Sequence, residues 1–211
     1  MTDLHGKKSS KENLGKLLES DYDLLLILGD ITQFGPVSHV GEVLDFVEQF
    51  DLPVYSILGN CDPPGAVDLL ENRGVSLHSK VKSFGGLKFV GLGGSNDTPF
   101  DTPFELSEAE IGDVLEGLTK NLHGEWILVT HAPPYGTKAD KTSEGTHAGS
   151  KSIRRIIKSK PPLVNFCGHI HEARSVDTIN DTKIVNPGPL GEGYAVKLVY
   201  EDEIEIELLK V

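Results

Sequence analysis

Short motifs of aspartate, asparagine and histidine recur in this chain, and each one follows or closes an apolar run. The run at residues 22–28 leads into Gly29-Asp30, and the run at residues 126–130 leads into His131. Continuous apolar runs of this length are typical of strands that are buried on both faces. Because open α/β sheets build their sites at the carboxyl ends of such strands, the sequence predicts an α/β fold with polar residues gathered at one edge.

The residues in these motifs carry the oxygen and nitrogen donors that metals bind. Seven of them are candidate metal ligands: Asp3, His5, Asp30, Asn60, His131, His169 and His171. A hydrophobic core has no use for so many carboxylate, amide and imidazole groups, so we interpret them as a site for two metal ions. The D-x-H and H-x-H pairs put both members on one side of an extended chain. Asp30 is the best-placed residue to bridge the ions.

The kinds of donor narrow the choice of metal. Two divalent ions about 3.5 to 4 Å apart can clamp a phosphoryl group and lower the pKa of a bound water. Mixed imidazole and carboxylate ligation suits Mn, Fe, Zn, Co or Ni rather than calcium. We therefore expect two divalent transition-metal ions as cofactors, with manganese favoured.

Helix-like and strand-like segments alternate along the first half of the chain, as in βαβ units. Helices are predicted at residues 11–19, 37–50, 66–72, 107–122 and 150–158. Strands are predicted at residues 22–28, 53–58, 126–130, 163–167, 174–178, 183–185, 194–200 and 204–209, with short antiparallel strands within 75–92. The last strands are expected to form an antiparallel meander whose final turn is Glu201-Asp202-Glu203. The polar stretch 132–149 is expected to be a functional loop.

Composition limits the class of protein. A chain of 211 residues with 38% hydrophobic content predicts one domain over residues 1–211. A net charge of −12 makes nucleic acid an unfavourable partner, because binding to it relies on Lys and Arg contacts with phosphates. The two cysteines are too few for a disulfide framework, and no signal peptide or bilayer-spanning run is present in the sequence. We expect a cytoplasmic protein that does not insert into membranes.

The motifs resemble, in their order, those of the calcineurin-like metallophosphoesterase superfamily. The matching segments are Asp3-x-His5, Gly29-Asp30, Gly59-Asn60-x-Asp62, His131 and Gly168-His169-x-His171. The resemblance implies a four-layer α/β/β/α sandwich of two mixed sheets. It implies that one metal is held by Asp3, His5, Asp30 and His171. It implies that the other is held by Asp30, Asn60, His131 and His169.

The function that this resemblance implies is that of a binuclear metal-dependent phosphoesterase. We favour a phosphodiesterase acting on a small phosphoester substrate, with metal-bound hydroxide as the nucleophile and Asn60 stabilising charge in the transition state. The alternatives are a non-catalytic interaction scaffold of the same fold, a phosphomonoesterase or a nuclease. Assembly into a homo-oligomer is compatible with each of them.

Cys61 is the first departure from the family pattern. The corresponding motif is usually Gly-Asn-His-Asp or Gly-Asn-His-Glu, in which the histidine acts as the acid for the leaving group. A thiol with a pKa of about 8.5 is mostly protonated at neutral pH, so Cys61 is a weak substitute for that acid or a small filler beside the metals. Small phosphodiesterase-like members share the Gly-Asn-Cys-Asp sequence, which favours substrates with an easy leaving group.

The second departure lies at the beginning of the sequence. Only Met1 and Thr2 precede Asp3, whereas an apolar strand of some five to seven residues would normally deliver this aspartate. The first strand is therefore missing or truncated in the sequence given. We expect an empty central position in one sheet, and five to ten further apolar residues encoded upstream in the same reading frame.

The remaining histidines and cysteine divide into one candidate and several structural residues. His147 precedes a predicted helix, whose N-terminus attracts phosphate, so it is a candidate substrate-binding residue. His39, His78 and His123 are interpreted as surface or capping residues, and Cys167 as part of the core.

Overall fold

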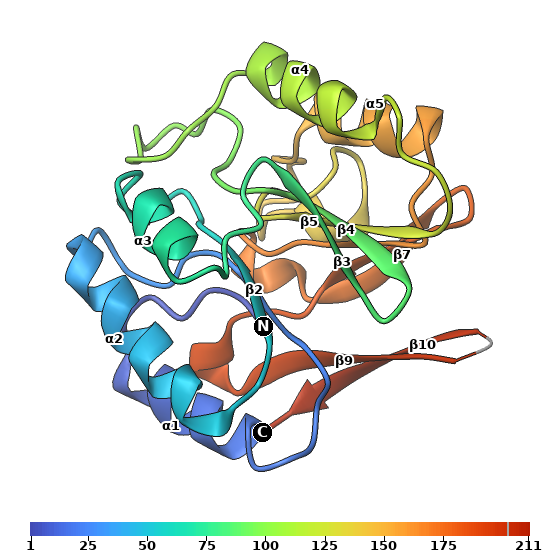
Figure 1. Cartoon of the computed structure of the whole chain (residues 1–211). Coiled ribbons are helices and arrows are strands. Elements are labelled where there is room, and N and C mark those ends of the chain that lie inside the picture. The colour runs from blue at the N-terminus through green and yellow to red at the C-terminus, as the bar shows by residue number, and fades with distance from the viewer. Residues whose placement is uncertain (202) are drawn as a thin grey trace.

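The computed structural model describes residues 1–201 and 203–211, and it is built of two strand layers between two helix layers (Figure 1). One layer is a six-stranded mixed sheet in the order β3-β4-β5-β6-β8-β7. Its strands are β3 (Lys80–Phe84), β4 (Leu87–Leu92), β5 (Trp126–Thr130), β6 (Val164–Phe166), β7 (Ser175–Ile179) and β8 (Thr182–Asn186). The four central strands are parallel, and the two edge strands are antiparallel to their neighbours. The predicted α/β/β/α architecture is confirmed.

The second strand layer is divided into two pairs. Strands β1 (Leu25–Leu28) and β2 (Val54–Ile57) are parallel, and β9 (Tyr194–Tyr200) and β10 (Ile204–Lys210) form an antiparallel hairpin. β1 and β9 do not pair as neighbours in a sheet, and a cavity of about 680 Å³ is lined by residues of both strands. The central position that was expected to be empty is therefore open among the described residues.

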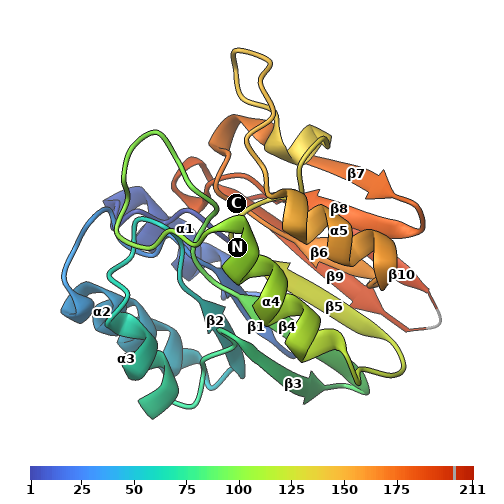
Figure 2. The ribbon, with the colours of Figure 1, turned by 90° about the horizontal axis from the view of Figure 1, so that it is seen from above.

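Five α-helices cover the two outer faces in the described part of the chain (Figure 2). The strand pair β1–β2 is covered by α1 (Lys8–Leu17), α2 (Val37–Val47) and α3 (Ala66–Asn72). The six-stranded sheet is covered by α4 (Glu108–Thr119) and α5 (Lys151–Ser159). Short 3₁₀ turns are η1 (Glu48–Phe50), η2 (Lys138–Asp140), η3 (His171–Ala173) and η4 (Leu190–Glu192). A capping box opens α4, because the Ser107 hydroxyl accepts from the Glu110 N–H and Glu110 accepts from the Ser107 N–H.

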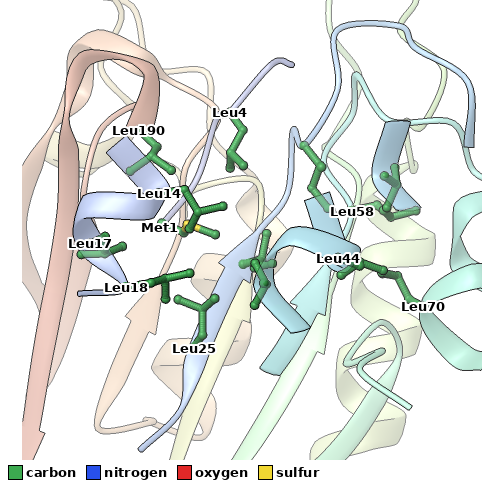
Figure 3. Close-up of a cluster of buried hydrophobic side chains, with 14 of the residues drawn as sticks. Met1, Leu4, Leu14, Leu17, Leu18, Leu25, Leu44, Leu58, Leu70 and Leu190 are labelled. Atoms are coloured by element: carbon green, nitrogen blue, oxygen red, sulfur yellow. The ribbon is translucent and has the colours of Figure 1, made fainter. Parts of the chain in front are cut away.

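The side chains of β1 alternate between two hydrophobic clusters. Leu25 and Ile27 pack with the helices α1 to α3, and Figure 3 shows Leu25 beside Leu18 in a cluster that also holds Met1, Leu14 and Leu17. Leu28 points the other way, into the cluster between the two strand layers. Burial on both faces explains why this strand reads as an uninterrupted apolar run.

The C-terminal strands differ from the predicted meander. All of β8 except Lys183 is buried, and the strand pairs with β6 on one side and with β7 on the other, so it is an inner strand of the six-stranded sheet. The turn η4 then carries the chain into the other layer, where β9 and β10 form a separate hairpin. Asp202, in the predicted final turn, lies outside the described residues. None of the helices in residues 1–201 and 203–211 has the length and apolar character needed to cross a bilayer.

Candidate metal centre

The polar motifs converge at the carboxyl ends of the strands. Asp30 follows β1, Asn60 follows β2, and His131 directly follows β5. Asp3 and His5 lie beside this edge, because the Asp3 N–H donates to the Gly29 carbonyl at 3.1 Å and the His5 N–H donates to the Asp30 carbonyl at 2.9 Å. The sequence places these residues far apart, and the parallel strands bring them together.

One group of donors consists of Asp3, His5, Asp30 and His171, and one potential ligand atom from each lies within 4.8 Å of the others. His171 Nε2 lies 3.3 Å from Asp3 Oδ1, and His5 Nε2 lies 3.7 Å from Asp30 Oδ2. The Nε2 atoms of His5 and His171 are 2.9 Å apart. This group, which we call the Asp3 cluster, has the donor types and the spacing of a single-ion site.

The Asp3 cluster contains polar atoms that protein groups do not satisfy. Both carboxylate oxygens of Asp3 and Nδ1 of His5 are buried and have no hydrogen-bond partner among the described residues. A buried carboxylate without a donor is costly, on the order of 1–3 kcal/mol or more. A divalent cation would compensate this charge, so the residues present fit a metal.

A second group of donors surrounds His131. The Nε2 atom of this residue lies 3.1 Å from Asn60 Oδ1 and 3.4 Å from Asp30 Oδ1. Nδ1 lies 2.8 Å from the Leu28 carbonyl, which can only accept, so Nδ1 carries a proton and Nε2 is the nitrogen that faces Asn60 and Asp30. The His169 ring packs edge-on against the His131 ring, with 5.2 Å between their centroids. Asp30 therefore faces both groups of donors. Its Oδ2 lies toward His5 of the Asp3 cluster, and its Oδ1 lies toward His131.

Charges within the site shift its pKa values in opposite directions. Burial alone would raise the pKa of Asp30, but the charge and proximity of His131 lower it well below its usual range. Burial would lower the pKa of His131, and the charge of Asp30 outweighs this effect and raises it to about 9. Burial, followed by the charge of His131, lowers the pKa of His169 to about 4. Protons and metal ions therefore compete for His131, while His169 is free to bind as a neutral ligand.

Four candidate ligands have left-handed backbone conformations. The φ angles are 54° for Asp3, 50° for His5, 49° for Asp30 and 69° for His169. A residue with a side chain pays about 1 kcal/mol or more for this conformation, and it persists only where the surrounding structure fixes it. Such strain clusters at functional sites, and four of the nine non-glycine residues with positive φ among those the structure describes are candidate ligands.

The glycines of the motifs permit close backbone contact. A Cβ atom on Gly59 would lie 2.0 Å from Asp30 Oδ1, and a Cβ on Gly168 would lie 2.1 Å from the Thr2 hydroxyl. Both distances are shorter than any real contact, so a larger residue would displace Asp30 or the Thr2-Asp3 segment.

Asp62 is a structural residue whose role the sequence analysis missed. Its buried carboxylate accepts hydrogen bonds from the N–H groups of Gly59, Ile31 and Thr32, at 2.9, 3.1 and 2.7 Å. Burial and the charge of Asp30 raise its pKa to about 6. Asp62 thereby joins the loop after β1 to the loop after β2. The only sequence signal was its place in the motif Gly59-Asn60-x-Asp62.

Cys61 lies against the site with 8% of its surface exposed. Its N–H donates to Asp30 Oδ1 at 2.8 Å, and its Sγ lies 3.7 Å from Asn60 Nδ2. Burial, together with the negative charge of Asp30, raises the pKa of the thiol far above its usual range. The thiol is therefore protonated at neutral pH and is a weaker acid than a free cysteine.

Thr102 and Glu105, which the sequence analysis also missed, orient Asn60. The Asn60 Nδ2 donates to the Thr102 hydroxyl at 3.0 Å, and that hydroxyl donates to Glu105 Oε1 at 2.5 Å. Glu105 also accepts from the Thr98 hydroxyl and N–H. With its NH₂ group engaged, Asn60 presents its carbonyl oxygen to His131.

His147 is held by a buried aspartate. Its Nδ1 lies 2.8 Å from Asp140 Oδ1, and Asp140 also accepts from the N–H groups of Gly136, Thr137 and Gly149. The His147 side chain is 36% exposed. The same loop is tied to the segment that carries His171, because the Ser143 N–H donates to Glu172 at 2.9 Å. His147 is thus oriented and accessible in a loop that adjoins the site.

The other histidines and the second cysteine have structural positions. His39 and His123 are exposed, as predicted. His78 is half-buried, and its Nδ1 accepts from the Gly93 N–H at 3.0 Å. Cys167 is fully buried in the cluster beneath α4 and α5, which confirms its interpretation as a core residue.

Comparison with known proteins adds independent findings. A family model described as calcineurin-like phosphoesterase matches residues 1–173. An uncharacterised protein of Methanocaldococcus jannaschii is 42% identical over 198 residues, which cover 90% of this chain and 86% of that protein. A Synechococcus protein named probable cyclic nucleotide phosphodiesterase is 26% identical over 165 residues, which cover 75% of this chain and 62% of that protein. The match therefore spans less than two thirds of the Synechococcus protein.

A solved structure shows the same fold. The crystal structure of a Thermus thermophilus protein matches with a TM-score of 0.75, covering 100% of this chain and 96% of that chain. The sequence identity is 16%, so this likeness shows the architecture alone.

Proposed function

This chain belongs to the calcineurin-like phosphoesterase family, and we propose that it hydrolyses small phosphodiesters at a centre of two divalent transition-metal ions, with manganese favoured. The observation that carries the proposal is the position of Asp30. One of its oxygens faces His5 and the other faces His131, so a single carboxylate is shared between two groups of donors. A shared carboxylate is what two ions held close together require.

The two donor groups define the proposed ligand sets. The first ion would be held by Asp3, His5, Asp30 and His171. The second would be held by Asp30, Asn60, His131 and His169. When bound, the ions would supply Lewis acidity to the phosphoryl group and make a water molecule acidic enough to be deprotonated near neutral pH.

The protein's own contribution is to hold the donors in place. The Leu28 carbonyl fixes the tautomer of His131, and the Thr102 hydroxyl fixes the orientation of the Asn60 amide. Preorganised donors of this kind need no rearrangement as charge develops on a reacting phosphoryl group. Asn60 would stabilise that charge in addition to acting as a ligand.

The proposed preference for diesters with good leaving groups rests on Cys61. A buried thiol with a raised pKa gives little help to a departing alkoxide, whereas an aryl leaving group needs little help. The name of the Synechococcus relative, a probable cyclic nucleotide phosphodiesterase, also supports the diester class.

We propose that His147 contacts the substrate. Its Nε2 is left available because Nδ1 is engaged by Asp140, and the ring is accessible to solvent. With Nδ1 held by a buried carboxylate, the ring is oriented so that Nε2 can form a hydrogen bond with a phosphoester.

Three alternatives, a scaffold, a monoesterase and a nuclease, are separated from the proposal by one experiment. A scaffold would not need a full set of donors, and a monoesterase or nuclease would prefer other esters. The experiment is metal analysis of the purified protein, followed by assays of matched aryl monoesters and diesters and of single-stranded DNA with Mn, Ni, Co, Zn and Mg. We expect two ions per chain and faster diester hydrolysis. Preference for the monoester or DNA, or the absence of any hydrolysis with bound metal, would refute the proposal.

A further inference from the structure

Most of the exposed phenylalanine and tyrosine side chains lie on loops at the edge where the donors gather. In the described part of the chain four such side chains are exposed. Phe34 follows β1, Phe100 follows β4, and Tyr135 follows β5. The fourth, Phe50, lies in η1 at the far end of α2. One exposed aromatic residue is ordinary, whereas several on loops beside a polar site indicate a binding surface.

Phe34 combines two unfavourable features. Its side chain is 56% exposed, and its φ angle of 56° lies in the left-handed region, which a bulky residue rarely adopts. The Phe34 N–H donates to the Cys61 carbonyl at 3.1 Å, so the backbone is fixed beside the site. Glycine would adopt this conformation without strain. A phenyl ring that is kept in solvent on a strained backbone indicates a role in binding rather than in folding.

Phe100 has the most exposed large hydrophobic side chain in the described part of the chain, at 81%. Its N–H donates to the Thr98 hydroxyl at 3.2 Å, and that hydroxyl donates to Glu105. Glu105 also accepts from the Thr102 hydroxyl, which holds the Asn60 amide. The loop that carries Phe100 is therefore fixed to a candidate metal ligand.

The two phenylalanines are anchored to one dipeptide, Asn60-Cys61. Phe34 is bonded to the Cys61 carbonyl, as described above. Phe104, in the loop that carries Phe100, donates its N–H to the Asn60 carbonyl at 3.1 Å. Both loops thus meet at the segment that supplies a donor to the candidate metal centre, so a ligand held there would lie next to them.

Tyr135 has different surroundings. Its ring lies 5.7 Å from the His147 ring, measured between centroids, and 5.4 Å from the Lys151 ammonium group. Its faces are therefore engaged by groups of the protein, and we leave it out of the surface formed by Phe34 and Phe100.

We propose that Phe34 and Phe100 bind the planar aromatic group of a phosphoester whose phosphoryl group lies at the candidate metal centre. The inference rests on the proposed function and makes it more specific, because it names the class of ester as one that carries an aryl ring or a nucleobase. Phenyl rings bind such groups by offset or edge-to-face stacking. An aliphatic ester of the same charge would gain little from these two residues.

The test measures the binding of two matched pairs of ligands to the manganese-loaded protein by calorimetry. Phenylphosphonate is compared with methylphosphonate, and adenosine monophosphate with ribose phosphate, so that each pair differs in an aromatic group. The variants are Phe34→Gly, Phe100→Ala and the two combined. Phe50→Ala is the matched control, because it removes an exposed ring at the other end of α2.

The parent should bind the aromatic member of at least one pair about tenfold more tightly than its partner. A preference in the first pair identifies an aryl group next to the phosphorus, and a preference in the second identifies a nucleobase. Each single variant should reduce the preference, the double variant should abolish it, and Phe50→Ala should keep it. The affinity for methylphosphonate should stay unchanged throughout. Phe34→Gly should not lower Tm, because glycine relieves the left-handed strain.

The outcomes separate this inference from the proposed function. Equal affinities within both pairs in the parent would overturn the inference and leave the metal centre intact, and so would a preference that survives in the double variant. A lower Tm in Phe34→Gly, with equal losses of affinity for both members of a pair, would assign Phe34 a structural role instead. If the parent binds none of the four ligands, the proposed metal centre itself fails, and the inference fails with it.

Discussion

The backbone N–H of Cys61 donates to Asp30 Oδ1 at 2.8 Å, so the loop after β2 fixes the carboxylate at the end of β1. The same oxygen lies 3.4 Å from His131 Nε2. Asp30 is thus positioned by a residue outside the proposed ligand sets. This arrangement makes it possible to remove the charge of Asp30 without removing the hydrogen bond that holds it.

Asp30→Asn should abolish hydrolysis and bring the metal content down. The amide oxygen can still accept from Cys61, but the neutral side chain can no longer bridge two cations. Metal analysis and the diester assay measure the effect. Asp113→Asn, an exposed change on α4, is the matched control and should behave as the parent. Full metal content and unchanged turnover in Asp30→Asn would contradict the site assignment.

Glu105→Gln should destabilise the protein in a pH-dependent manner. Burial alone would raise the pKa of Glu105, but hydrogen bonds from Thr102 and Thr98 lower it from 4.5 to about 2. Because the folded-state pKa is depressed, the stabilisation is present above pH 4.5 and is lost as the pH falls through about 2. The variant should differ most from the parent near neutral pH and converge with it near pH 2.

This convergence is measured by urea unfolding, between pH 2 and 7, of protein from which a chelator has removed any bound metal. Glu144→Gln, at an exposed position, is the matched control and should show no such pH-dependent difference. A constant difference between Glu105→Gln and the parent across the whole range would show that the charge of Glu105 contributes nothing.

His147→Ala should weaken substrate binding more than turnover. A residue that contacts the substrate through one hydrogen bond contributes about tenfold, so KM should rise by about that factor with a smaller change in kcat. His123→Ala, in an exposed position, controls for loss of a histidine. An unchanged KM with metal content intact would remove His147 from the site. A fall in kcat alone would indicate a role in the chemical step instead.

The sequence predicted local elements well where one pattern decided them. The helix Ala66–Asn72 and the strand Trp126–Thr130 have the bounds that were expected. The prediction of an antiparallel meander was wrong because strand order depends on which layer each strand can join. All of β8 except Lys183 is buried, which fits an inner position, and nothing in its short run predicted β6 as its neighbour.

The candidate donors were predicted in order, but the groups that hold them were not. Asp62 and Asp140 accept several backbone N–H groups, and these donors belong to chain segments whose proximity exists only in the fold. The left-handed conformation of Asp30 has the same origin. Sequence patterns report burial and spacing, whereas support of this kind arises from tertiary contacts.

Cys61→Ala should leave hydrolysis of activated aryl diesters within about threefold of the parent rate. The contribution of a general acid grows as the leaving group becomes more basic, and an aryl oxide needs little protonation. The thiol is buried against Asp30 and has a raised pKa, so it contributes little as a proton donor in the parent protein. Removing the thiol should therefore change the hydrolysis rate little for any leaving group, apart from the effect of the small cavity left behind.

Cys61→His provides the opposite test at the same position. An imidazolium here would be a competent acid, so alkyl and cyclic-nucleotide diesters should gain rate, by about 10²-fold at most, while aryl diesters change little. The measurement is the slope of log kcat/KM against leaving-group pKa for the parent and both variants. The slope should be shallowest for Cys61→His and similar for the other two. If Cys61→Ala loses activity steeply on every diester, including the most activated, then the thiol is a ligand or a nucleophile and its proposed role is wrong.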